Sequence, residues 1–213
     1  MSVPASGTAG VLAAIEDSDR FLVQQVFRPI ANEYRISIPP PGSTEEGEAV
    51  LFVKQKKMSV KEDIRFRTAP DVDDHLFMIK SKTVFEFRGR HDVLDDEGRV
   101  IGQLEKVFGR SLLRSHWRIR GADGEELFEA REANLAIALI RRFADLISDW
   151  LAALQWLPFN FVLLRAGEPV GSYQRVLGKL RDRYVLQIDS GLDGVDRRLV
   201  IAFAIALDAL QDR

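Results

Sequence analysis

The stretch DRRLVIAFAIALDALQDR, residues 196–213, decides the fold that this sequence predicts. Nine consecutive residues within it, 199–207, carry no polar side chain. Its alanines are strong helix formers and neither glycine nor proline interrupts the run, so a helix is favoured over a strand. At helical spacing the large apolar side chains form one stripe and the small ones form another, which lets a second backbone approach closely. The two stripes are Leu199, Phe203, Leu207 and Leu210, and Ala202, Ala206 and Ala209.

This helix is apolar on all sides, so it is either enclosed by its own protein or inserted in a membrane. A membrane span needs ~20 apolar residues, whereas charged residues close in on this helix after about a dozen. We therefore expect a buried helix, with structural core positions at Leu199, Ile201, Phe203, Ala206 and Leu207. Asp193 or Asp196 is expected to cap its start.

The charge of the chain is unevenly distributed. Its 213 residues carry a net charge of −2, but residues 51–120 hold 16 Lys and Arg against 11 Asp and Glu. Such an excess marks either an anion-binding surface or an ordinary solvated face. The candidate anion or lipid surface consists of Lys54, Lys56, Lys57, Lys80, Lys82, Arg88 and Arg90.

The absence of cysteine excludes disulfides, thiolate metal sites and a cysteine nucleophile, and it fits a reducing compartment. The first residues lack the basic region of a signal peptide. We therefore expect a cytoplasmic protein, with a flexible N-terminal tail over residues 1–19 and a single domain over residues 20–213.

Turn residues between apolar runs predict three hairpins. Residues 91–107 turn at 95–98, residues 116–131 turn at 122–125, and residues 159–176 turn near Gly167 and continue into a strand at 183–189. The first and third hairpins repeat each other, because residues 98–110 align without a gap on residues 167–179 with their glycines matched. A repeated unit with conserved spacing of glycines predicts bulges or bends in a curved sheet.

Residues 132–157 lie between the second and third hairpins and predict a long amphipathic helix. Its apolar face could pack on the rest of the fold, present a surface to a partner or a second copy of the chain, or lie flat on a bilayer. Two arginines balanced by two aspartates on the polar face disfavour the bilayer. The candidate interaction residues are Phe143, Ile147, Trp150, Leu154 and Trp156.

The sequence lacks the usual motifs of catalysis and of metal binding. His75, His91 and His116 are scattered without metal-ligand spacing, and there is no G-x-S-x-G elbow. Gly178-Lys179 lacks the first glycine and the Ser/Thr of a phosphate loop. We therefore expect a non-enzyme with no metal, no cofactor and no nucleic-acid partner.

Several segments together resemble the LURP-one-related and phospholipid-scramblase-related proteins of the tubby C-terminal-like superfamily. They are FLVQQVFRPIANEYRI (21–36), LFVKQKKMSV (51–60), HDVLDDEGRVIGQLEKV (91–107), HWRIRGADGEE (116–126), the G-x-P-V-G hairpin from Gly167, and DRRLVIAFAIALDAL (196–210). The resemblance implies a mainly β fold of the α+β class. It is a closed antiparallel β-barrel of about twelve strands, threaded by the C-terminal helix. The helix at 132–157 departs from the simplest form of that family.

The resemblance implies a fold more firmly than a function. Tubby domains bind phosphoinositides and scramblases act at membranes, but no phosphoinositide or calcium motif of those families matches here residue by residue. The leading hypothesis is a non-enzymatic barrel, peripheral to the membrane, that binds anionic lipid head groups or another amphiphile. The alternative is a protein-interaction or scaffold module that uses the helix 132–157, and a homodimer is compatible with it. Arg197 and Arg198 either bind an anion at the barrel mouth or pair with a nearby carboxylate, which is the favoured explanation.

Overall fold

The computed structural model describes residues 7–27, 31–56, 63–81, 89–107, 116–132, 160–176 and 183–209. Two α-helices, a short 3-10 helix and twelve strands lie within these ranges. In chain order they are α1 (Thr8–Glu16), β1 (Arg20–Phe27), β2 (Ala31–Ile38), β3 (Glu48–Lys56), β4 (Ile64–Arg67), β5 (Phe77–Ser81), β6 (Arg90–Asp95), β7 (Val100–Val107), β8 (His116–Gly121), β9 (Glu126–Glu132), β10 (Asn160–Arg165), β11 (Glu168–Arg175), β12 (Arg183–Ile188), η1 (Ser190–Leu192) and α4 (Arg197–Ala209).

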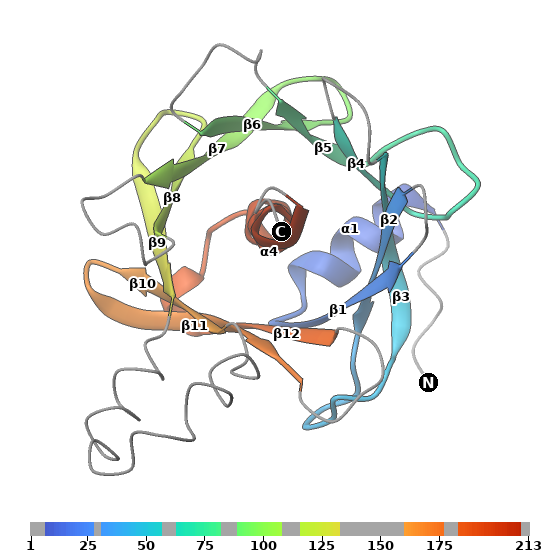
Figure 1. The fold of residues 1–213 in the computed structure, drawn as a ribbon, viewed down its shortest axis with the longest axis horizontal. Coiled ribbons are helices and arrows are strands. Elements are labelled where there is room, and N and C mark those ends of the chain that lie inside the picture. Colours follow the sequence, from blue (N-terminus) through green and yellow to red (C-terminus); the bar gives the residue numbers. More distant parts are fainter. Residues whose placement is uncertain are drawn as a thin grey trace, which may run out of the picture.

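The twelve strands form one closed antiparallel barrel (Figure 1). Each strand pairs with its neighbours in the sequence, and β12 closes the ring by pairing with β1, where Phe21 lies opposite Leu186. Closure leaves no unpaired sheet edge. The expectation of a mainly β fold, built as a closed barrel of twelve strands, is confirmed.

The three expected hairpins are present as β6–β7, β8–β9 and β10–β11. Their turns contain Gly98, Gly124 and Gly167, with φ angles of 80°, 84° and 87°. Glycine adopts this left-handed conformation without the steric cost that a side chain brings. The turn chemistry of the sequence therefore fixes where these strands begin and end.

The internal repeat has a structural basis. Gly102 in β7 lies opposite Val93, and Gly171 in β11 lies opposite Leu163, and in both hairpins the strand register shifts directly after this pair. A Cβ atom on Gly102 would lie 2.5 Å from a backbone oxygen of the next strand, and a Cβ atom on Gly171 would lie 2.6 Å from one. The repeated glycines therefore mark two bulged positions where strands approach too closely for a side chain.

Helix α4 lies in the middle of the ring in Figure 1. Every residue from Leu199 to Leu207 is buried, including all five structural core positions expected from the sequence. The ring of Phe203 makes edge-to-face contacts with Trp117, Phe128 and Phe161 from three neighbouring strands, at centroid distances of 6.4, 6.1 and 6.4 Å. Among the helices that the structure describes, none has the length and apolar content that a membrane span requires.

The start of α4 is stabilised by carboxylates. The Arg198 backbone N–H donates to Asp196 Oδ1 at 2.9 Å, so Asp196 is the cap. The Arg198 guanidinium pairs with the same carboxylate at 2.7 Å, and the Arg197 guanidinium pairs with Asp19 at 2.8 Å. The salt-bridge explanation of this arginine pair is therefore confirmed.

The N-terminal segment differs from the expected flexible tail. Residues Thr8–Glu16 form helix α1, in which Val11 and Ile15 are buried and belong to the hydrophobic core. The expectation failed because the burial comes from tertiary contacts with α4 and β3, which the local sequence does not encode. Residues 1–6 and the expected helix 132–157 lie outside the described residues, apart from Glu132, which ends β9.

Candidate functional site

The basic residues singled out in the sequence are spread over several strands. Lys54 and Lys56 lie in β3, Lys80 lies in β5 and Arg90 lies in β6. The remaining three residues, Lys57, Lys82 and Arg88, lie outside the described residues. The side chains of Lys54 and Lys80 are exposed, and Lys80 lies opposite Asp92 of β6. The structure therefore does not bring these residues together as one basic cluster within the part of the chain that it describes.

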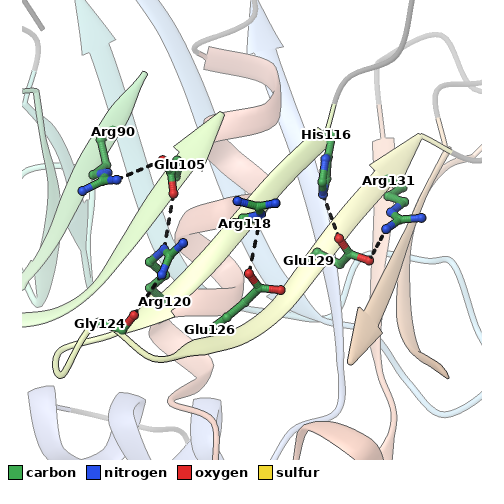
Figure 2. Close-up of polar contacts among 9 residues, drawn as sticks. All are labelled: Arg90, Glu105, His116, Arg118, Arg120, Gly124, Glu126, Glu129 and Arg131. Carbon is green, nitrogen blue, oxygen red and sulfur yellow. Dashed lines mark hydrogen bonds and ion pairs between the residues drawn. The ribbon is translucent and has the colours of Figure 1, made fainter. Parts of the chain in front are cut away.

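Arg90 belongs to a compensated array of charges on strands β6–β9, which we call the charge array (Figure 2). Its Nη2 lies 3.0 Å from Glu105 Oε1, and Arg120 Nε lies 3.3 Å from the other oxygen of the same carboxylate. Burial alone would raise the pKa of Glu105. The hydrogen bonds and charges of the two arginines outweigh that effect, so the pKa lies below its ordinary value.

The same arrangement recurs on β8 and β9 (Figure 2). The Glu129 carboxylate lies 2.8 Å from His116 Nε2 and 2.7 Å from Arg131 Nη2. Burial again acts to raise the pKa of Glu129, and its two basic partners bring it below the ordinary value. Arg118 and Glu126 form a looser pair at 3.5 Å. Since its cations already face carboxylates, the charge array has little capacity left for an external anion.

The outer surface of β2, β3 and β4 has a different charge balance. Leu51 and Val53 of β3 point into the core. Because side chains alternate along a strand, Phe52 and Lys54 point outward. In the strand register, Arg35, Phe52 and Arg67 form one outward row, and Glu33, Lys54 and Arg65 form the next. These two rows contain four cations and a single carboxylate. We call Arg35, Lys54, Arg65 and Arg67 the basic face.

A hollow of about 300 Å³ lies on the basic face. Its lining combines cations and carboxylates with apolar groups, contributed by Val26, Glu33, Tyr34, Arg35, Phe52, Val53, Lys54, Arg67, Pro70 and Asp71. The site can therefore contact both a charged group and an adjoining apolar group.

The three cations of the hollow differ in how they are compensated. Arg35 pairs with Glu46 at 2.8 Å and lies over the Phe52 ring at 5.6 Å, while Lys54 is 3.9 Å from Glu33. The Arg67 side chain forms no hydrogen bond or ion pair with any described residue, and its Nε is buried without a partner. A guanidinium whose Nε has no acceptor, beside two further cations, can attract an anion to this hollow.

Sequence reasoning found Lys54 but missed the arginines around it. Arg35 lies outside the basic middle third of the chain, and Arg65 and Arg67 belong to a strand of only four residues, IRFR. The alternation of apolar and basic residues in IRFR could have indicated that Arg65 and Arg67 share one face, because residues two apart on a strand point to the same side.

Two further predictions from the sequence concern an interaction surface and a metal site. The candidate interaction residues Phe143, Ile147, Trp150, Leu154 and Trp156 all lie outside the described residues. Within the described ranges, no group of three or more His, Cys, Asp or Glu side chains is arranged to hold a metal ion.

Comparison with known proteins gives the family. The family model described as LURP-one-related matches residues 49–208, from the second residue of β3 to the penultimate residue of α4. No curated protein matches the chain significantly in sequence. The tubby-like superfamily expected from the sequence is consistent with the matched family. Since the match spans well over half of the 213 residues, the chain belongs to the LURP-one-related family.

Proposed function

We propose that this protein is a non-enzymatic, cytoplasmic binding barrel that recognises the phosphate of an anionic lipid head group at a membrane surface. The observation that carries the proposal is the uncompensated Arg67 in the hollow of the basic face. A buried polar nitrogen without an acceptor is costly, and a phosphate oxygen would supply that acceptor. Arg35 and Lys54 would add charge on either side of it.

The arrangement suits a phosphate that is attached to a lipid. An arginine offers its donors in a planar fork that matches phosphate oxygens, while a lysine acts as a point charge. Val26, Phe52 and Pro70 adjoin the cations and would contact the apolar part of the interface. The same phosphate chemistry could come from a free ion, so the test must separate the two sources.

Vesicle co-sedimentation tests the proposal. Full-length protein is mixed with phosphatidylcholine vesicles, with and without phosphatidylserine, and with inorganic phosphate as a soluble competitor. We expect binding only to the anionic vesicles, reduced at least about tenfold by Arg67→Gln, which removes about 1.4 kcal/mol of binding free energy. The matched control is Arg131→Gln in the charge array, because its side chain is 59% exposed and already paired with Glu129.

Three results would each exclude the proposed site. One is equal binding to neutral and anionic vesicles. The second is an equal loss of binding in the Arg131→Gln and Arg67→Gln variants. The third is complete competition by millimolar inorganic phosphate, which would indicate a site for free anions and not for lipid.

For α4 we propose the role of a structural core around which the barrel closes, and not that of a membrane anchor. Support comes from the burial of residues 199–207 and from the aromatic contacts of Phe203. The test is Ala206→Asp, which introduces a carboxylate at a fully buried position. A buried unpaired charge costs several kcal/mol, so we expect loss of folding. A folded, soluble variant that has only lost vesicle binding would support an anchor.

A further inference from the structure

Helix α1 lies beside α4 inside the ring of strands. In Figure 1 it lies between α4 and strands β1–β3, and it contacts both α4 and β3. Val11 and Ile15 are 5% and 1% exposed, and Leu12 and Ala14 pack against the core at their side. The wall behind them is apolar, because β3 points Leu51 and Val53 inward. α1 therefore fills an apolar site made by other parts of the chain.

The helix that fills this site has little stability of its own. It contains nine residues, and its N-cap, Gly7, offers no side chain to the free backbone N–H groups. No basic residue lies in its last turn, and Glu16 and Asp17 place negative charge at its C-terminal end, where the helix dipole is already negative. Isolated helices of this length are unstable in water. The docking of two or three apolar side chains is therefore what keeps α1 helical.

A buried cation lies where the chain leaves α1. Arg197 is 6% exposed as a residue. Its Nη2 donates to the carboxylate of Asp19 at 2.8 Å, while its Nε is buried without a hydrogen-bond partner. Asp19 itself is exposed and follows α1 by only three residues. A carboxylate from a ligand could therefore replace Asp19 at this guanidinium.

We propose that the space held by α1 is a binding site for a single-chain anionic amphiphile. Its alkyl chain displaces α1 from the apolar wall and its carboxylate pairs with Arg197. This site is separate from the basic face and does not depend on the proposed head-group function. The class of ligand follows from an apolar wall that would contact an alkyl chain and from a buried cation that would contact a carboxylate. Binding would shift α1 from a docked to an undocked population.

Single-cysteine labelling tests the proposal, because the natural chain has no cysteine. Val11→Cys reports undocking of α1. Val200→Cys, the same substitution at a fully buried position of α4, reports opening of the central core. The thiols are reacted with a soluble disulfide reagent, with and without sodium laurate below its micelle concentration. We expect Val11→Cys to react at least about a hundredfold faster than Val200→Cys, since local opening is more frequent than global opening. Laurate should increase the rate at Val11→Cys to a plateau.

Equal rates at the two cysteines, or a rate at Val11→Cys that laurate leaves unchanged, would overturn the proposal. Asp19→Asn added to Val11→Cys removes the nearer of the two carboxylates that pair with Arg197, the other being Asp193 at 3.8 Å. It should lower the laurate concentration at half effect, and an unchanged concentration would overturn the assignment of the carboxylate to Arg197. Amide hydrogen exchange of the unsubstituted protein gives an independent reading should a cysteine variant fail to fold. Protection of residues 8–16 as strong as that of residues 199–207, with and without laurate, would also overturn it.

Discussion

Phe203→Ala probes how much of the stability of the barrel depends on α4. The Phe203 ring is fully buried and contacts the rings of Trp117, Phe128 and Phe161 on β8, β9 and β10. Removing it deletes the centre of this cluster and leaves a cavity that the rigid strands cannot close. Substitutions of buried Phe by Ala cost about 3–5 kcal/mol. That is a large part of the roughly 5–15 kcal/mol by which domains are stable.

Urea unfolding followed by circular dichroism measures this loss. With an m-value of about 2 kcal/mol per M, the midpoint should fall by roughly 2 M while the m-value stays the same. Phe203→Leu keeps most of the apolar volume and should lose much less. Val72→Ala, at an exposed loop position, serves as the control and should leave the midpoint in place. A loss below about 1 kcal/mol for Phe203→Ala would show that these rings do not form a tightly packed centre.

Three further predictions concern stability. Gly102→Ala should cost about 1–3 kcal/mol in urea unfolding, because its Cβ would lie 2.5 Å from a backbone oxygen and 2.7 Å from Leu199 Cδ2. Burial lowers the pKa of His91 in the folded protein, so the unfolded chain takes up a proton at higher pH than the folded chain. The free energy of unfolding should therefore decrease as the pH is lowered from about 7 to about 5. His91→Gln should flatten this pH dependence. Burial acts to raise the pKa of Asp95, but hydrogen bonds from Arg99 outweigh it and hold the pKa low. Asp95→Asn should therefore destabilise the protein at neutral pH, and the difference from the natural protein should vanish as the pH falls below the ordinary range of Asp.

Local chemistry was sufficient to predict the hairpins. Gly98 and Gly124 follow acidic or small turn residues between alternating strands, and such turns form from short-range preferences alone. The repeated Gly102 and Gly171 indicated bends, and the structure places both at register shifts. The apolar run of residues 199–207 identified a helix that needs to be enclosed, because no surface helix tolerates so many apolar residues on all sides.

What the sequence could not supply were contacts between distant segments. α1 has only nine residues and no side-chain cap at Gly7, so its helix depends on docking that the closed barrel provides. Counting charges along the chain selected Arg90, but the pairing of β6 with β7 places Glu105 beside it. The same count gave no weight to Arg67, which combines a buried Nε without a hydrogen-bond partner with a place in the hollow of the basic face.

The most direct test of the central claim is to ask which face of the barrel meets an anionic membrane. A fluorophore is attached through Thr68→Cys, beside Arg67 at the end of β4, or through Gln174→Cys, an exposed position of β11. Each labelled protein is mixed with vesicles that contain phosphatidylserine and a lipid-borne quencher. We predict that the Thr68→Cys probe is quenched and that Arg67→Gln abolishes this quenching, while the Gln174→Cys probe is unaffected. Equal quenching at both positions, or quenching at Gln174→Cys alone, would contradict the claim that the basic face binds the lipid.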